Sequence, residues 1–306
     1  MKNNYSVSQV NSMALKDAEN FVNTAIGEYE KRISSAVDNI LKNPVIDIVL
    51  LAGPSSSGKT TSAKKIVQGI EKKGKTAYII SLDDFYFDRD DIPVNSDGLP
   101  DYENITALDI PLIKETFNSL INERTALLPV FNFKTGKREK EKRIMHLGQN
   151  DVVVVEGIHA LNPVITQGIA PEHIYKIYIS VSSRFLSDEG KVVMTKRNIR
   201  FVRRMIRDYR FRSSTVEFTY FLWDGVSKGE DKFIFPYKNQ ADEFINSIHA
   251  FEVCMFRDEA IELLNHIEKS SSYYSKAQSL KDALMCFAPL SRDLLPEDAL
   301  LREFIG

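Results

Sequence analysis

The stretch that decides the fold is Val45-Ile-Asp-Ile-Val-Leu-Leu-Ala-Gly-Pro-Ser-Ser-Ser-Gly-Lys-Thr60. Its first half, residues 45–52, is almost entirely apolar, which is typical of a central parallel strand buried on both faces. Its second half matches the spacing G-x-x-x-x-G-K-[ST] of a phosphate-binding loop. The loop residues, with the threonine that follows, are Gly53, Pro54, Ser55, Ser56, Ser57, Gly58, Lys59, Thr60 and Thr61. The stretch therefore predicts a strand, a loop that surrounds an anion, and a helix.

Each part of the loop has a mechanical reason. Gly53 and Gly58 permit the backbone angles that turn successive N–H groups inward around phosphate oxygens. A helix beginning at Lys59 points its unpaired N–H groups and its positive dipole end at the same anion. In such loops the lysine reaches the β- and γ-phosphates, and the hydroxyl at Thr60 binds Mg²⁺. We therefore expect a nucleotide, ATP or GTP, to bind here together with Mg²⁺.

Outward from the loop, buried strands alternate with amphipathic helices, which indicates βαβ units and a parallel sheet. We predict helices at 12–42 (one or two), 59–73, 108–124 and 191–209, strands at 75–82, 151–155 and 175–181, and a loop at 83–104. Beyond residue 250 the pattern is helical. The predicted fold is α/β, a P-loop NTPase-type parallel sheet flanked by helices, with helical additions at both ends. The predicted divisions are an N-terminal helical segment (1–44), a core (45–250) and a C-terminal helical extension (251–306).

The composition narrows the class of protein. The 306 residues carry 40 basic and 42 acidic side chains, for a net charge of −2, and this balance argues against a nucleic-acid-binding protein. The two cysteines, Cys254 and Cys286, lack metal or redox spacing, which suits a reducing compartment. The polar start has no apolar signal region, and the longest apolar run is about eight residues, against the ~20 that span a bilayer. We expect a cytoplasmic protein without a membrane segment.

Acidic residues follow two of the predicted strands. Asp83 and Asp84 come after the strand at 75–82, and Glu156 comes directly after the strand at 151–155. In open α/β sheets ligands bind beyond the carboxyl ends of the strands. Phosphoryl transfer needs a base for the acceptor hydroxyl and a carboxylate near the metal, and Asp83 and Glu156 would meet these needs. An Asp-Asp pair is elsewhere often only a turn or a helix cap, but its place beside the phosphate loop favours function.

A row of arginines marks the helix predicted at 191–209. Arg200, Arg204 and Arg207 share one face, with Arg210 and Arg212 where the helix is expected to end. The opposite face carries the apolar residues Val202, Met205, Ile206 and Tyr209. Guanidinium groups over a transferring phosphoryl group stabilise its charge. A solvated helix face would give the same pattern, so the spacing alone leaves both interpretations open.

Other candidate features are weaker. The tract 134–143 holds six basic residues in ten, and its Thr135-Gly136 pair predicts the tip of a hairpin. A solvated hairpin is the default interpretation, and RNA contact is the alternative. The five histidines have no metal-ligand spacing, and His159 is equally suited to lining a site or to packing. The aromatic residues at 85–87 and 102 could stack on a base or belong to the core.

Several segments together resemble the uridine kinase and phosphoribulokinase superfamily of P-loop kinases. They are Gly53 to Thr61, Leu82-Asp-Asp-Phe-Tyr86, Pro129-Val-Phe-Asn-Phe133, Val155-Glu-Gly-Ile158 and Arg203-Arg-Met-Ile-Arg-Asp208. A bacterial uridine-kinase-like (nucleoside kinase) group is more similar still, because it shares the segments Phe133-Lys-Thr-Gly-Lys-Arg138, Glu156 to Pro163, Arg210-Phe-Arg212, Ile234-Phe-Pro236 and Leu301-Arg-Glu-Phe-Ile-Gly306. That group often carries a further N-terminal region, where this chain has the helical segment.

The resemblance implies a role for each matching residue. Asp83 is the base for a nucleoside 5′-hydroxyl, and Tyr86 and Glu103 contact the nucleoside. Phe131 and Phe133 hold the base, and Arg138 belongs to the substrate-binding set. Arg204, Arg207 and Arg212 match arginines that close over the phosphates. The predicted catalytic residues are therefore Asp83, Lys59 and the three arginines Arg204, Arg207 and Arg212. The predicted Mg²⁺ ligands are Thr60 and Glu156.

Two positions depart from the pattern of uridine kinases. Gly136 stands where those enzymes have a histidine that reads the pyrimidine, and Ser214 stands where they have an arginine. Losing a polar partner of the substrate base can remove much discrimination. We expect an ATP- and Mg²⁺-dependent nucleoside kinase, with uridine first. A kinase of another small hydroxylated metabolite (a sugar phosphate or a pantothenate-like acceptor) and a regulatory nucleotide switch remain alternatives, and the resemblance suggests a homo-oligomer.

Overall fold

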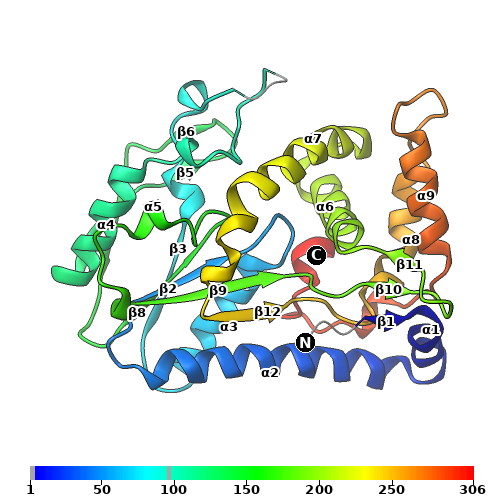
Figure 1. The fold of residues 1–306 in the computed structure, drawn as a ribbon, viewed down its shortest axis with the longest axis horizontal. Helices are drawn as coiled ribbons and strands as arrows, with labels where there is room; N and C mark the ends of the chain where they lie inside the picture. The colour runs from blue at the N-terminus through cyan, green and yellow to red at the C-terminus, as the bar shows by residue number, and fades with distance from the viewer. Residues whose placement is uncertain (1–3, 95–97) are drawn as a thin grey trace.

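A five-stranded parallel sheet forms the centre of the molecule in the computed structural model, which describes residues 4–94 and 98–306 (Figure 1). Residues 1–3 of the polar start and 95–97 of the predicted loop lie outside this range. The strand order is β12-β9-β2-β8-β3, and every pairing is parallel. The bounds are β2 (Ile48–Ala52), β3 (Ala77–Ser81), β8 (Val152–Glu156), β9 (Ile174–Ser180) and β12 (Glu243–Asn246). The predicted α/β fold is confirmed.

The two central strands explain why the sheet forms. Every residue of β2 and β8 is buried, as their continuous apolar runs predict. Successive side chains alternate between two hydrophobic clusters, with Val49 and Leu51 on one face and Ile48 and Leu50 on the other. In register, Glu156 pairs with both Leu51 of β2 and Ser81 of β3. The loops that leave these three strands therefore begin side by side.

Helices and hairpins cover the two faces. The cluster with Val49 joins α3 (Lys59–Glu71), α6 (Lys196–Arg212), α8 (Glu252–Leu264) and α2 (Ala18–Lys42), which runs along the lower edge in Figure 1. The cluster with Ile48 joins α4 (Ile110–Asn122), α5 (Pro163–Thr166) and two hairpins. These hairpins pair β4 (Thr125–Leu128) with β7 (Arg143–His146), and β5 (Phe131–Asn132) with β6 (Lys137–Arg138). The hairpin predicted around Thr135-Gly136 is confirmed.

The arginine helix begins and ends later than predicted. Residues 192–194 form strand β11 (Val192–Met194), which pairs with β10 (Phe185–Leu186), and β10 pairs with β1 (Tyr5–Ser6). The helix α6 starts only after Thr195, whose side chain accepts the Asn198 N–H as an N-cap. It then continues through Arg212, so Arg210 and Arg212 belong to the helix. Tyr209, predicted to anchor it, is 45% exposed.

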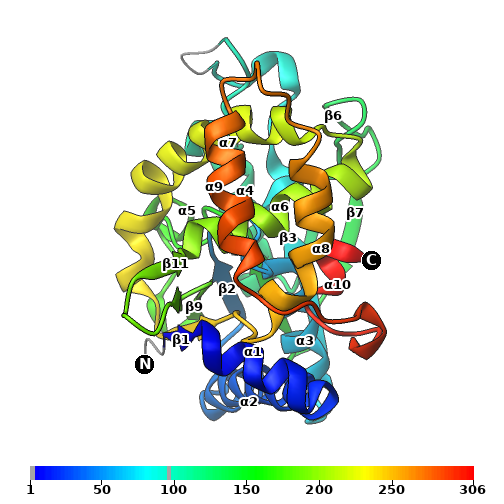
Figure 2. The same ribbon diagram turned by 90° about the vertical axis from the view of Figure 1, so that its right-hand side faces the viewer.

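Both ends of the chain pack on the core. The predicted helix 12–42 is two helices, α1 (Val7–Lys16) and α2, because the Asp17 side chain caps the second. Two further helices complete this side: α7 (Val216–Gly229) crosses the upper middle of Figure 1 and contacts α6, and α9 (Tyr274–Met285) stands at the right. Figure 2 shows α8 beside α9. The short α10 (Arg302–Ile305) packs against α6. One hydrophobic cluster includes residues of both ends and of the sheet, while the divisions at residues 44 and 250 stay predictions.

Candidate active site

The phosphate loop joins β2 to α3 at the carboxyl edge of the sheet. Gly58 has φ +84°, a left-handed conformation that glycine adopts without strain, and Ser56 has φ +57°. The hydroxyl oxygens of Ser56 and Ser57 are buried and have no hydrogen-bond partner within residues 4–94 and 98–306. Buried hydroxyl groups are seldom left unpaired in proteins. The loop therefore fits a polar ligand that supplies acceptor oxygens, as a phosphate does.

An acidic pair lies beside the loop. Glu156 at the end of β8 is buried, and its Oε1 accepts the Ser81 hydroxyl at 2.8 Å. Burial, and then the charge of Asp83, raise the pKa of Glu156 to about 7, while Lys59 lowers it. Burial also raises the pKa of Asp83, against the opposing charges of Lys59 and then Arg212. Both carboxyl groups would hold a proton more weakly beside a cation, so the pair fits a site that binds Mg²⁺ or an additional positive group.

The metal site would be incomplete without the ligand. No cluster of three or more His, Cys, Asp or Glu side chains suited to a metal occurs within the described part of the chain. Mg²⁺ usually takes one or two protein oxygens and completes its shell with phosphates and waters. Glu156 and the exposed Thr60 hydroxyl fit that pattern as the protein ligands. His159 is buried, with its ring edge-on to Phe233 at 6.3 Å between centroids.

Three arginines of α6 gather around one buried carboxylate. Asp208 pairs with Arg204, Arg207 and Arg212 at 3.2, 2.7 and 3.5 Å. Arg204 also donates through Nη1 to the Ser55 hydroxyl of the phosphate loop at 2.9 Å. The pKa values of Arg204 and Arg212 are lowered, mainly by burial. Three guanidinium groups on one carboxylate leave excess positive charge next to the loop, which suits a phosphoryl group.

Arg200 is the arginine whose place differs most from prediction. It is buried, and it forms a two-pronged ion pair with Glu230 at 2.6 and 2.7 Å. Its Nη1 also donates to the Ser55 carbonyl at 2.9 Å, and the Ser55 N–H donates to Glu230 Oε1 at 3.0 Å. Arg200 and Glu230 therefore hold the backbone of the phosphate loop from both sides. Nothing in the sequence near Glu230 indicated this role.

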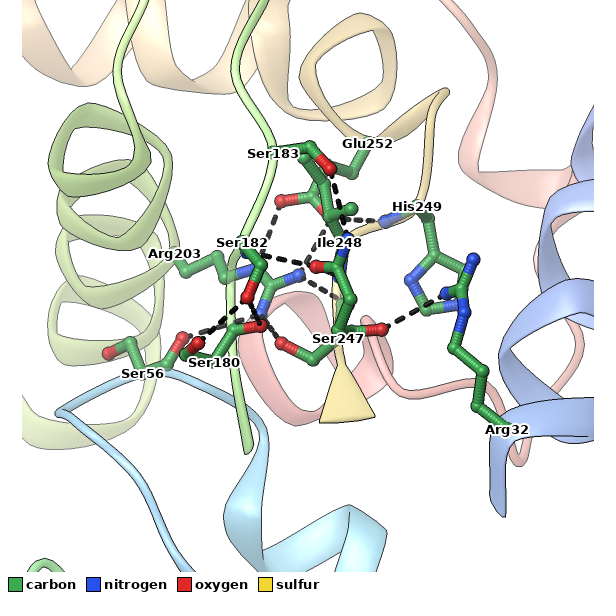
Figure 3. A network of polar contacts seen from close by, with 11 residues as sticks. Arg32, Ser56, Ser180, Ser182, Ser183, Arg203, Ser247, Ile248, His249 and Glu252 are labelled. Carbon is green, nitrogen blue, oxygen red and sulfur yellow. Dashed lines mark hydrogen bonds and ion pairs between the residues drawn. The ribbon is translucent and has the colours of Figure 1, made fainter. Parts of the chain in front are cut away.

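A second buried network holds the next residue of the loop (Figure 3). Arg203, fully buried, donates through Nε and Nη2 to the two oxygens of Glu252 at 3.0 and 2.7 Å. The same guanidinium donates to the Ser247 carbonyl at 2.9 Å and to the Ser56 carbonyl at 3.3 Å. Arg203 thus joins α6, α8 and the left-handed turn of the loop. The sequence placed Arg203 in a matching segment but gave no sign of its partners.

The predicted acceptor residues form an aromatic cluster. Tyr86 follows the short turn after β3, and its ring meets Phe131 of β5 at 6.0 Å and Tyr102 at 5.2 Å between centroids. Phe133 packs edge-on against Phe131 at 5.0 Å and remains 57% exposed. The rings pack edge-on to one another, so the exposed Phe133 ring is the part of the cluster open to a planar group. The structure brings these residues together from segments 45 positions apart (86 to 131).

Glu103 is close enough to interact electrostatically with Lys59 of the phosphate loop and with Tyr86 of the aromatic cluster. Its Oε2 is buried with no partner in the described part of the chain. Burial, and then the charge of Glu230, raise the pKa of Glu103 to about 7, whereas Arg204 and Lys59 lower it. The side chain presses on Gly229, where an added Cβ would meet the Glu103 Cβ at 2.4 Å. An unpaired carboxyl oxygen here suits a hydrogen bond from a substrate hydroxyl.

Arg138 lies behind the acceptor residues. Its guanidinium donates to the carbonyls of Tyr86 and Phe85 at 2.7 and 2.8 Å and to Asp109 at 3.0 Å. All three of its nitrogens are therefore engaged by protein groups. In this structure Arg138 supports the segment that follows Asp83.

These features define a class of protein: a P-loop protein with the charges of a phosphoryl-transfer site at the carboxyl edge of its sheet. The chain belongs to the Phosphoribulokinase / Uridine kinase family, whose profile matches residues 48–253. It is 30% identical over 203 residues to a uridine kinase of Lactobacillus helveticus, covering 66% of this chain and 86% of that protein. A uridine kinase of Halalkalibacterium halodurans is 30% identical over 205 residues, covering 67% and 86%.

Solved structures resemble the chain more distantly. One titled a possible uridine kinase from Bacillus stearothermophilus has a TM-score of 0.48 at 18% identity, covering 71% of this chain and 99% of that one. The phosphoribulokinase from Rhodobacter spheroides has a TM-score of 0.43 at 15% identity, covering 67% and 74%. Among the helices within residues 4–94 and 98–306, none combines the length and apolar character needed to cross a membrane.

Proposed function

We propose that the protein is an ATP- and Mg²⁺-dependent kinase that phosphorylates the 5′-hydroxyl of a nucleoside, with uridine as the first candidate. The observation that carries this proposal is the position of Asp83, which lies in the turn after β3, next to the charge of Lys59 and three residues before Tyr86 of the aromatic cluster. The family and the names of the uridine kinases that the chain resembles support a kinase of this type. The family resemblance also leads us to propose a cytoplasmic enzyme that forms a homo-oligomer.

The residues of the chain divide the work of transfer. Asp83 would accept the proton of the acceptor hydroxyl, and a raised pKa makes its carboxylate a stronger base. Lys59 and the arginines Arg204, Arg207 and Arg212 would hold the phosphates and stabilise the charge that develops on them. Mg²⁺, held by Thr60 and Glu156, would neutralise phosphate charge when bound. Since GTP carries the same phosphates, these groups accept either donor, and ATP is our proposal.

The residues proposed to hold the acceptor favour a nucleoside over a small sugar. Phe133 offers an exposed aromatic ring to a planar base, with Phe131 packed against it and Tyr86 against Phe131. Glu103 could accept hydrogen bonds from ribose hydroxyls. An added Cβ at Gly136 would meet Arg89 Nε at 2.6 Å. Arg89 therefore fills the space of a side chain at 136, and we propose that its guanidinium contacts the base instead. A small hydroxylated metabolite is the alternative acceptor.

The test is a transfer screen with ATP and Mg²⁺ across nucleosides and small sugars, in which the mass of the product identifies the acceptor. Asp83→Asn should keep ATP binding and lose transfer, because the amide cannot accept the proton. Asp91→Asn, the same change at an exposed neighbouring turn, serves as the control.

Transfer by Asp83→Asn at the wild-type rate would contradict the base assignment. ATP hydrolysis with no phosphorylated product would instead support a regulatory switch. RNA affinity that is salt-sensitive and survives Lys59→Ala would indicate an RNA-binding role for the tract 134–143.

A further inference from the structure

The C-terminal helix places a carboxylate on the phosphate-loop helix. One oxygen of Glu303, Oε2, accepts both the Thr61 N–H at 3.1 Å and the Thr61 hydroxyl at 2.7 Å. Thr61 lies in the first turn of α3, where backbone N–H groups have no partner inside the helix. These are the N–H groups that face an anion bound at the loop. A carboxylate of the chain itself thus occupies donors that a phosphate would use.

The backbone that carries Glu303 is fixed. Leu300, Leu301, Phe304 and Ile305 are all buried in the main hydrophobic cluster. Leu300 fits against the phosphate loop, where an added Cβ on Gly58 would meet Leu300 Cδ1 at 2.7 Å. A phosphate arriving at Thr61 would therefore have to move only the Glu303 side chain. The α10 backbone would stay in place, since its burial holds it.

A phosphate and the carboxylate cannot share this place. Both are anions, both need the same two donors, and like charges at contact distance repel strongly where solvent is partly excluded. We propose that Glu303 competes for these two groups of Thr61 with the nucleotide phosphate that binds nearest α3. Glu303 would then set how tightly the enzyme holds its nucleotide. The inference rests on the proposed function only in taking a nucleotide as the ligand of the loop. It requires no particular acceptor.

A simple helix cap is the competing explanation for Glu303. The N-cap position of α3 is Gly58, which has no side chain to bond the first turn. A carboxylate supplied from α10 could fill that structural role. The two explanations predict opposite results for nucleotide binding. Removing a competitor tightens binding, whereas removing a cap leaves binding unchanged or weakens it.

The experiment measures ADP binding by calorimetry in wild type, Glu303→Gln and Glu297→Gln. Glutamine keeps the length of the side chain and removes its charge, and Glu297 is an exposed residue of the same segment that controls for net charge. We expect Glu303→Gln to bind ADP about tenfold more tightly, as expected for loss of one charge-assisted competitor. Inorganic pyrophosphate, titrated in the same way, should also bind more tightly to Glu303→Gln than to wild type. Glu297→Gln should match wild type.

Equal or weaker ADP binding by Glu303→Gln would overturn the inference, as would an equal gain in Glu297→Gln. The result is separate from the proposed function, because binding of ADP involves no acceptor. If wild type transfers phosphate to none of the acceptors while Glu303→Gln still tightens ADP binding, the nucleoside kinase proposal fails and the role of Glu303 stands. If neither protein binds ADP or pyrophosphate, both fail.

Discussion

Replacing Glu156 by glutamine should change how the stability of the protein depends on pH. Glu156 is 7% exposed, and burial followed by the charge of Asp83 raises its pKa from 4.5 to about 7. That difference corresponds to about 3 kcal/mol. Since the folded state binds this proton more tightly than the unfolded state, the contribution is complete below about pH 4.5 and is lost as the pH rises through about 7.

The assay is urea unfolding of wild type and Glu156→Gln from about pH 4.5 to about pH 8, without metal or nucleotide. The amide oxygen can still accept the Ser81 hydroxyl, so the variant differs mainly in charge. The free energy of unfolding of the variant, relative to wild type, should increase by about 3 kcal/mol across this range. Glu297→Gln, at an exposed site, should change little with pH.

Parallel pH curves for wild type and Glu156→Gln would refute the reasoning, since they would mean that Glu156 titrates alike in the folded and unfolded states. A second comparison connects the result to the proposed metal site. Mg²⁺ with nucleotide should stabilise wild type more at about pH 8 than at about pH 6, because the metal requires the charged carboxylate. Glu156→Gln should lose that difference.

Three further outcomes follow from the site. Arg203→Met should lower the free energy of unfolding by about 3–5 kcal/mol, because Glu252 stays buried without its partner. Adding Glu252→Gln should restore part of the lost stability, measured by urea titration. A double variant no more stable than Arg203→Met alone would contradict this explanation. Arg138→Met should slow phosphate transfer more than it weakens ADP binding, since Arg138 holds the segment after Asp83. An equal fold-change in transfer rate, from kinetics, and in ADP affinity, from calorimetry, would argue against that role. Gly58→Ala should cost at least about 1–2 kcal/mol in unfolding experiments, because of the positive φ and because the added Cβ would meet Leu300 Cδ1 at 2.7 Å. An unchanged stability would contradict this prediction.

Much of the fold could be predicted because its signals are local. The strands β2 and β8 are continuous apolar runs, and strands buried on both faces leave that mark in the sequence. The start of α6 could not be predicted in the same way. Residues 192–194 are apolar and lie next to a helical pattern, and it is their pairing with β10, just before them in the chain, that makes them a strand. The N-cap at Thr195 is a local sign of the boundary.

In the candidate site, too, the residues with local sequence signals could be predicted and those that act through distant contacts could not. The phosphate loop, Asp83 and Glu156 were predicted because a short motif and strand ends carry them. Glu230 and Glu303 were missed because each acts on the loop from a distant segment, 175 and 242 positions along the chain. A single sequence without its contacts gives no indication of such pairs. Arg200 shows the same limit, since its burial depends on Glu230.

The attachment of α6 to the phosphate loop determines which parts of the molecule can move during a reaction. Arg200 holds the Ser55 carbonyl and Arg203 the Ser56 carbonyl, so this helix is joined to the loop at two successive residues. The arginines that follow on α6 cannot swing away as a hinged arm, because the hinge itself is fixed. We therefore expect the acceptor to enter near the β5–β6 hairpin, where the Phe133 ring is exposed. We expect the phosphate loop and α6, which hold the nucleotide, to keep one shape throughout turnover. Opening and closing would be confined to the segments that hold the acceptor.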